Sequence, residues 1–254
     1  MRVKEPISAI YPNMGYWLML FIAGIFGGFY FTYFSILTSP FPGIVHLHFS
    51  LMSVWVCMAI TQPLLIKYRK LSLHRKVGKL SYFLIPLVLL TSFLMMRHSY
   101  QGQLALLTEN ISNGQESMSI DEGLILLGSY QAIGFVYLIW LGSFYTLAIY
   151  FKKTPAIHAR FMVAAVLTFM GPTLDRILYF WFDVKYVFPG FGPEYVSFLL
   201  IDLILIFLLI YDLKKGRNLY PIIFSLSLYI LFQILYVIVP QSGAFSKLVN
   251  FLLD

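Results

Sequence analysis

The chain has 254 residues, of which 59% are hydrophobic and only 11% are charged, with a net charge of +7. Soluble domains carry about 25% charged residues, so this composition excludes a water-soluble protein with a normal polar surface. Most side chains must face lipid or one another, which makes the lipid bilayer the first predicted partner. The basic residues form short clusters between long apolar runs rather than one continuous face, which argues against a nucleic-acid partner.

Seven apolar segments are long enough to cross a bilayer, which takes about 20 residues. Turn-forming sequences separate several of them, such as the Pro-Gly-Phe-Gly-Pro run at 189–193. The predicted fold class is an all-α polytopic membrane helix bundle of about seven transmembrane helices, forming a single transmembrane domain over residues 1–254. The predicted spans are 16–37, 43–66, 78–96, 123–151, 158–182, 195–213 and 219–239.

Two further segments connect or follow these spans. Residues 97–122 are polar and acidic, and we expect them to form the longest loop and the only extramembrane feature. Residues 244–254 are too few to cross the membrane again; their pattern is amphipathic and is typical of a helix at the membrane interface.

The distribution of Lys and Arg predicts the orientation of the bundle. Basic residues gather at every second loop, and cytoplasmic loops carry such an excess. We therefore expect the N-terminus to be cytoplasmic. The basic loops contain Lys67, Arg69, Lys70, Arg75, Lys76, Lys152, Lys153, Lys214, Lys215 and Arg217.

His74 and His158 lie at helix starts on the predicted cytoplasmic side. Neutral imidazoles on facing helices can ligate a haem from both sides, so this pair predicts a haem or metal site. Histidines at helix ends also sit at the headgroup level, where they bond to water or lipid. Both interpretations fit the sequence.

His46, His48 and His98 lie near the opposite membrane face. His46 and His48 are two residues apart and therefore point about 200° apart around a helix, so they cannot share one face. At most one of them points into the bundle, with His98 or an acidic residue as its partner in a metal site.

Gln131, Asp175, Arg176 and Asp202 are the other polar residues that we place within or beside the apolar spans. Ionisable groups there are costly and usually face a cavity or one another. Asp202 is expected either to pair with Arg176, which would join two helices, or to form a proton or ligand site. Asp175 and Arg176 are adjacent and point in different directions, so each needs its own partner.

The sequence resembles an uncharacterised bacterial membrane family, domain of unknown function 2306, over residues 45–176. The resemblance is carried by His46-Leu47-His48, by the Leu73-His74-Arg75-Lys76-Val77-Gly78 turn, and by Ile157-His158-Ala159-Arg160-Phe161-Met162 followed later by Arg176. It implies a multi-pass protein of the bacterial inner membrane. A more distant similarity to cytochrome b561-type electron carriers implies that His74 and His158 hold haem b. The fourth span has Tyr130 and Gln131 where those carriers place a histidine.

Three functions follow from these residues. The first is a b-type haem protein that exchanges electrons with quinone or another redox partner. The second is a proton-coupled transporter or small-ligand-binding membrane protein that uses Asp202, Arg176 and the histidines of the outer face. The third is a structural or assembly factor. No hydrolase motif is present, and the sequence does not decide whether the protein is an enzyme.

Overall fold

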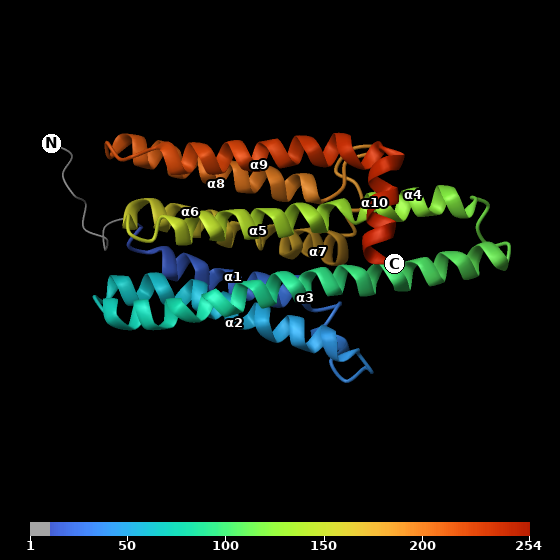
Figure 1. Ribbon diagram of the computed structural model, residues 1–254, viewed down its shortest axis with the longest axis horizontal. Coiled ribbons are helices and arrows are strands. Elements are labelled where there is room, and N and C mark those ends of the chain that lie inside the picture. The colour runs from blue at the N-terminus through green and yellow to red at the C-terminus, as the bar shows by residue number, and fades with distance from the viewer. Residues whose placement is uncertain (1–10) are drawn as a thin grey trace.

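The computed structural model describes residues 11–254, and its named elements are all helices (Figure 1). A single bridge between Phe188 and Phe191 is the only β-type pairing in this part of the chain. The helices are α1 (Met14–Phe29), η2 (Phe34–Ile36), α2 (Gly43–Lys67), α3 (Leu71–Ser112), α4 (Ile120–Tyr130), α5 (Ala132–Tyr150), α6 (Pro155–Leu167), α7 (Met170–Phe182), α8 (Glu194–Lys214), α9 (Tyr220–Ile238), η3 (Val239–Gln241) and α10 (Gly243–Leu253).

Six continuous helical segments have the length and apolar composition of membrane spans, so the protein is a multi-pass integral membrane protein of the predicted all-α class. They are 43–67, 71–112, 120–150, 155–182, 194–214 and 220–238. The predicted first span, 16–37, is divided between α1 and the short η2. With 16 residues, α1 is about 24 Å long and falls short of the roughly 30 Å of bilayer hydrocarbon. It packs against α2 and α7.

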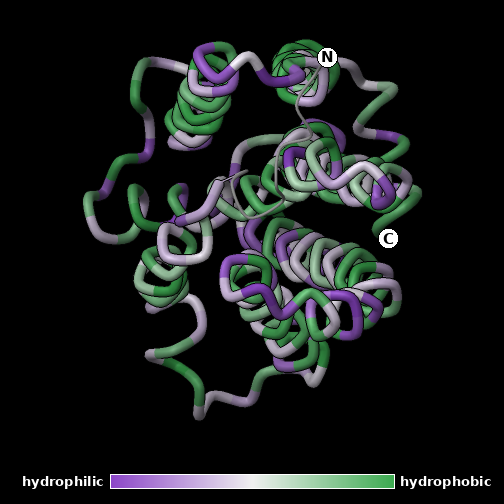
Figure 2. The backbone as a smooth tube through the Cα atoms, turned by 90° about the vertical axis from the view of Figure 1, so that its left-hand side faces the viewer, coloured by the Kyte–Doolittle hydropathy of each residue, from purple (hydrophilic) through white to green (hydrophobic). Residues whose placement is uncertain are grey.

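The helices run between two ends of the bundle. The turns that join α2 to α3, α5 to α6 and α8 to α9 lie together at one end, which we call the basic end because it carries the Lys and Arg clusters. Figure 2 looks onto this end and shows hydrophilic turns there. The opposite end carries the turn between α3 and α4, and we call it the hairpin end.

The prediction for residues 97–122 is wrong in part, because most of this segment is helical. The predicted third span, 78–96, is the middle of α3, whose 42 residues reach about 63 Å. That exceeds the 40–45 Å of a whole bilayer with its headgroups, so α3 and the start of α4 project from the hairpin end as a helical hairpin. Helix α4 begins with a capping box between Ser119 and Glu122.

Helix α10 lies across this hairpin rather than as a free tail (Figure 1). Its Val249 and Leu253 form a small core with Tyr100 of α3 and Leu127 of α4. The hydroxyl of Tyr100 donates to Asn250 Oδ1 at 2.8 Å. The opposite side of α10 remains apolar and exposed, with Phe251 at 82% exposure, as expected for a helix that also meets the membrane interface.

Two of the predicted spans contain a short interruption of one or two residues. Residues 123–151 are divided at Gln131 into α4 and α5, and residues 158–182 are divided at Thr168 and Phe169 into α6 and α7. The second break has a local cause, because Pro172 has no N–H to donate to the carbonyl of Thr168. The predicted spans 43–66, 195–213 and 219–239 agree with α2, α8 and α9 to within a residue or two.

The α6–α7 segment lies at the centre of the bundle. In its most apolar stretch 61% of residues are buried, compared with 22% in α2. The main core surrounds it and includes Trp55, Trp140, Phe161 and Tyr229. His158, Arg160, Asp175 and Arg176 all lie on this segment, so the fold brings its most costly side chains into the middle of the protein.

Candidate functional site

His74 lies in the first turn of α3, where the side chain of Gln62 from α2 reaches it. The Gln62 amide nitrogen donates to Nδ1 and to the carbonyl oxygen of His74, and the amide oxygen accepts from the Gly78 N–H at 3.1 Å. These two backbone groups fix the amide direction, because a carbonyl only accepts and an N–H only donates. Nδ1 of His74 is therefore an acceptor, and the proton of its neutral ring lies on Nε2.

His158 has the opposite arrangement. Its Nδ1 lies 2.7 Å from the carbonyl oxygen of Ala148 in α5, so Nδ1 carries the ring proton and Nε2 is left as an acceptor. The two imidazoles are close enough for a charge on one to act on the other. The structure thus brings the predicted pair together at the basic end, but only His158 is arranged as metal-ligating histidines usually are.

The three histidines of the hairpin end have separate surroundings. His46 Nδ1 lies 3.0 Å from the hydroxyl of Tyr33, and His98 is exposed on α3. His48 Nδ1 lies 3.1 Å from the hydroxyl oxygen of Thr91 on α3. Among the described residues there is no group of three or more His, Cys, Asp or Glu side chains placed to hold a metal ion.

The His48 ring has one free nitrogen. The hydroxyl of Thr91 donates to the carbonyl of Leu87 at 2.9 Å, so its oxygen is left to accept from His48 Nδ1–H. Nε2 of His48 is then an acceptor that can take up a proton. His48 is thus the member of the His46–His48 pair that contacts another helix of the bundle, and the charge of Arg176 acts on it.

Arg176 has no carboxylate partner in the described part of the chain. Its Nη1 donates to the carbonyl of Pro172 at 2.8 Å, one turn earlier in α7. Its guanidinium carbon lies 4.7 Å from the centre of the Phe29 ring of α1, a cation–π contact. A carbonyl dipole and an aromatic face compensate a partly buried positive charge only in part.

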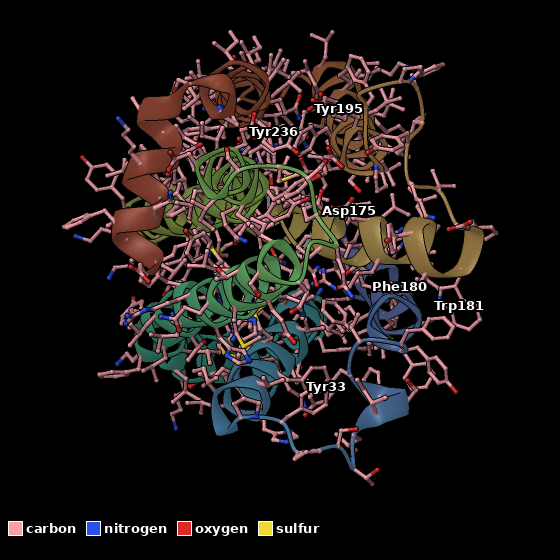
Figure 3. The ribbon with its side chains drawn as sticks, turned by 90° about the vertical axis from the view of Figure 1, so that its right-hand side faces the viewer. Tyr33, Asp175, Phe180, Trp181, Tyr195 and Tyr236 are labelled. Atoms are coloured by element: carbon pink, nitrogen blue, oxygen red, sulfur yellow. The ribbon has the colours of Figure 1, made fainter. Side chains whose placement is uncertain are left out.

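Asp175 is turned away from Arg176, as expected for neighbouring residues on a helix. Its Oδ2 accepts from the hydroxyl of Tyr137 on α5 at 2.8 Å, and its Oδ1 accepts from the hydroxyl of Ser197 on α8. Figure 3 looks onto this end and shows Asp175 between the helices, on the side of Tyr195 and Tyr236. The partners are neutral hydroxyls, so this carboxyl group is hydrogen-bonded but not neutralised by a cation.

A second carboxylate lies nearby. Glu194, at the start of α8, accepts from the hydroxyl of Tyr236 on α9 at 3.0 Å, and its charge acts on Asp175. Sequence reasoning missed Tyr137, Ser197 and Tyr236 because an isolated hydroxyl in an apolar helix has no pattern. It also left Glu194 out, although an acidic residue directly after the Pro189–Pro193 turn was a usable signal.

Asp202 does not form the ion pair with Arg176 that was one of its two expected roles. Its Oδ1 instead accepts from the side-chain amide of Gln233 on α9 at 3.1 Å. The interaction joins α8 to α9, so a helix-joining role remains, with a neutral partner in place of a charged one. Gln131 is buried at the junction of α4 and α5 and lies apart from these contacts as the C-cap of α4.

The most completely buried charges are at the basic end. Arg160 of α6 and Asp212 of α8 are exposed by 1% and 0%, and Arg160 Nε lies 2.6 Å from Asp212 Oδ2. Arg217 Nη1 donates to Asp212 Oδ1 at 3.1 Å, and the hydroxyl of Tyr11 donates to Oδ2 at 2.9 Å. Burial raises the pKa of Tyr11 well above its usual range, so the phenol stays protonated as a donor.

The sequence analysis recognised Arg160 only as a neighbour of His158 and did not single out Asp212. The signal was available, because Asp212 is an acidic residue two positions before Lys214, at the end of a helix that leads into a basic turn. What the sequence could not give is the pairing of two residues that are 52 positions apart.

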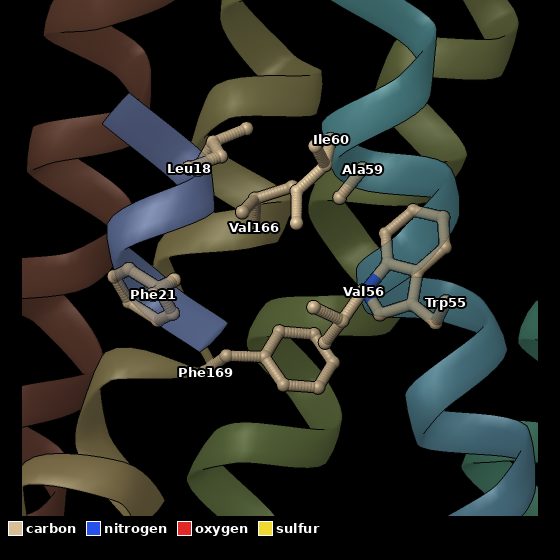
Figure 4. Close-up of a pocket in the computed structure, with 8 residues that line it drawn as sticks. All are labelled: Leu18, Phe21, Trp55, Val56, Ala59, Ile60, Val166 and Phe169. Atoms are coloured by element: carbon tan, nitrogen blue, oxygen red, sulfur yellow. The ribbon is translucent and has the colours of Figure 1, made fainter. Parts of the chain in front are cut away.

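Two cavities in the described part of the chain lie away from these charges. One holds about 10 Å³, room for about one water, and is lined by apolar side chains of α1, α2 and α6 together with Phe169 (Figure 4). The other is an open groove of about 280 Å³ between α2 and α3, lined by Ser53, Val54, Cys57, Met58, Thr61 and Val77.

The fold and composition define the chain as a polytopic integral membrane protein with polar clusters at both ends of its central helical segment. No family model matches the sequence, and comparisons with curated proteins and with solved structures likewise find no match. The function is therefore argued from the polar clusters themselves.

Proposed function

We propose that the protein is a proton-coupled transporter that binds a small anionic solute at its hairpin end. The observation that carries the proposal concerns Arg176, a partly buried guanidinium that contacts a carbonyl and an aromatic ring but, within residues 11–254, forms no ion pair with a carboxylate. An unpaired charge in a membrane protein is costly and marks a ligand or ion pathway. An anion beside Arg176 would supply the missing negative charge.

His48 supplies the proton coupling in this proposal. Its Nε2 is an acceptor in the neutral ring and lies in the electrostatic field of Arg176. Without an anion, protonation of His48 would place two positive charges near each other; with an anion between them, the second charge is stabilised. Binding of the anion and uptake of a proton at His48 therefore favour each other.

The first test measures anion binding by the full-length protein in detergent. Acetate, succinate and inorganic phosphate are added separately at constant ionic strength, and the unfolding temperature is recorded, since a ligand that binds the folded state raises it. We expect at least one of these anions to stabilise the wild type by more than it stabilises Arg176→Gln. Arg97→Gln is the matched control, an arginine of the same end that is bonded to the Asp254 carbonyl oxygen.

A response of Arg176→Gln equal to that of the wild type would overturn the site, and so would the absence of a response to all three anions. Transport is tested in proteoliposomes with the anion that binds. An imposed proton gradient should accelerate uptake by the wild type. His48→Gln should bind the anion yet lose the acceleration, and uptake that is indifferent to the gradient in the wild type would contradict the proton coupling.

Orientation and location belong to the same proposal. The excess of Lys and Arg supports a cytoplasmic basic end, so that Arg176 faces outward. The resemblance to domain-of-unknown-function family 2306 supports a bacterial inner membrane. Labelling of single cysteines at the α5–α6 turn and at the tip of the α3–α4 hairpin, from outside intact cells, would test the orientation.

A haem b held by His74 and His158 and exchanging electrons with quinone is the second proposal, favoured by the arrangement of His158 and by the similarity to b561-type carriers. As arranged, the pair does not fit a haem ligated from both sides, because Nδ1 of His74 accepts from Gln62 and leaves the proton on Nε2. An absorption spectrum of the purified protein decides the matter. A Soret band that disappears in both His74→Ala and His158→Ala would support it, and a featureless spectrum after expression with added haem would end it.

A further inference from the structure

The carboxylate of Asp212 is held as proteins hold a bound anion. Its two oxygens accept from Arg160 of α6, from Arg217 of the α8–α9 turn and from Tyr11, which precedes α1. Three separate segments thus converge on one carboxylate that is completely buried. Two guanidinium groups and a phenol are a donor set that recognises carboxylates in general.

Arg160 uses only part of its donor capacity on Asp212. Nε donates to Asp212 Oδ2, and Nη1 donates to the carbonyl of Ala156 at 2.6 Å. Nη2 is completely buried and has no hydrogen-bond partner among residues 11–254. Nε and Nη2 form the edge of a guanidinium that binds a carboxylate with two parallel hydrogen bonds, and here half of that edge is empty. A buried donor without an acceptor is costly, so it indicates a missing group.

Asp212 is shared between two arginines. Its second oxygen accepts from Arg217 Nη1 at 3.1 Å, and no hydrogen bond joins it to Arg160 Nη2. A carboxylate that was free of Arg217 could take both donors of Arg160 at once. The site is therefore better suited to a carboxylate that is not tied to the end of α8 than to Asp212.

We propose that Arg160 forms an inner binding site for a carboxylate-bearing anion, and that Asp212 occupies this site when the solute is absent. The solute's carboxylate binds the Nε–Nη2 edge of Arg160, and Asp212 then stays with Arg217. Tyr11 covers the site, since its hydroxyl bonds to Asp212 and its ring centre lies 5.7 Å from the Arg160 guanidinium carbon. The identity of the solute rests on the proposed transport function, in which this site releases the anion that Arg176 admits.

The first experiment removes the internal occupant. Asp212→Gly in the full-length protein leaves Arg160 charged and vacates the position of the carboxylate, so the unfolding temperature should fall. Formate or acetate should restore it in a saturable manner, whereas chloride at equal ionic strength should not. Asp202→Gly is the matched control, because its partner is the neutral amide of Gln233 and added carboxylate should not restore it. Inorganic phosphate in a parallel series shows whether the site selects carboxylates or accepts any oxyanion.

The second experiment keeps Asp212 and decides the matter if Asp212→Gly does not fold. In the Arg176→Gln background, where the outer site is removed, acetate should still raise the unfolding temperature. Adding Arg160→Lys, which keeps the charge but lacks the two-donor edge, should abolish that response. A response to acetate that survives Arg160→Lys, or no response in the Arg176→Gln background, would overturn the inner site. Either result leaves the outer site to be judged by the Arg176 comparison in the wild type.

Discussion

The α6–α7 segment carries an arginine near each end, and the two positive charges are compensated in different ways. Arg160 and Arg176 lie about 24 Å apart along α6 and α7; Arg160 is fully buried and Arg176 is partly buried. At the basic end the chain supplies its own counter-charge, because Asp212 accepts from Arg160 and Arg217. At the hairpin end the adjacent carboxyl group of Asp175 is bonded to hydroxyl groups instead, and Arg176 is left with a carbonyl and a ring.

This difference shows which end is complete without a ligand. At the basic end, Arg160 and Asp212 neutralise each other and the Tyr11 hydroxyl bonds to the pair, so no further counter-charge is needed. Only one donor of Arg160 is without an acceptor. The guanidinium of Arg176 feels the charge of Asp175 but forms no direct ion pair with it, since that carboxyl group is bonded to hydroxyl groups. In the proposed function, the basic end is closed by the chain's own residues and the hairpin end binds an anion.

Asp212→Asn is expected to cause the largest loss of stability, and it tests the contrast between the two ends directly. The substitution preserves shape but leaves Arg160 charged and unpaired in the core, and removal of one partner from a buried pair costs about 3–5 kcal/mol. Unfolding in detergent, followed by intrinsic Trp fluorescence, measures the loss. Asp202→Asn is the control and should cost less than about 1 kcal/mol, because an amide can still bond to Gln233.

Equal losses of stability in the two variants would show that Asp212, with its charged partners, contributes no more than Asp202, which has a neutral partner. They would also remove the distinction between the basic end, where a carboxylate of the chain pairs with Arg160, and the hairpin end, where Arg176 has no such ion pair. A loss confined to Asp212→Asn would sharpen it, because the two aspartates lie on the same helix and differ mainly in the charge of their partners.

Much of the fold could be predicted from the sequence, because it depends on local composition. Apolar runs of about 20 residues predicted α2, α8 and α9 closely. The predictions failed where helix length is not limited by lipid. Polar residues after Met96 were interpreted as a loop, yet α3 continues to Ser112, because α4 and α10 pack against it outside the membrane span.

The candidate site was predictable only by residue type. His74, His158, Asp175 and Arg176 were singled out because charge or imidazole within an apolar span is costly. Their partners were not, because Gln62, Tyr137, Ser197 and Asp212 come from other helices and only the packing of the bundle brings them near. The expected pairing of Asp202 with Arg176 was wrong for the same reason.

Gly28→Ala should have an intermediate effect, directed at the hairpin end. A methyl group at Gly28 would lie 2.6 Å from the backbone oxygen of Thr173, so α1 and α7 would have to separate. Such overpacking costs about 1–3 kcal/mol, and it would also move Phe29 away from Arg176. Gly27→Ala is the neighbouring control, with nothing within 4 Å of the added methyl, and should be neutral or stabilising.

Thermal unfolding measures the stability difference between the two glycine variants, and the anion response measures the site. We expect Gly28→Ala to weaken the response to added anion and Gly27→Ala to preserve it. Identical behaviour of the two variants would mean that close contact between α1 and α7 does not support the Arg176 environment.

The smallest effect is expected from Tyr137→Phe, which removes one of the two hydroxyl donors to Asp175. A single hydrogen bond contributes about 0.5–1.5 kcal/mol, and Ser197 keeps the other oxygen satisfied, so the protein should remain folded. Tyr130→Phe is the control, since Tyr130 is exposed and its hydroxyl is not part of this network.

If Asp175 only joins α5, α7 and α8, the loss of stability will be the whole effect of Tyr137→Phe. If it takes part in proton coupling, Tyr137→Phe will also shift the pH at which anion uptake is half-maximal, while anion binding at Arg176 persists. A variant that loses binding altogether would show that Arg176 and Asp175 act as one unit, against the separation of their partners on which the comparison is built.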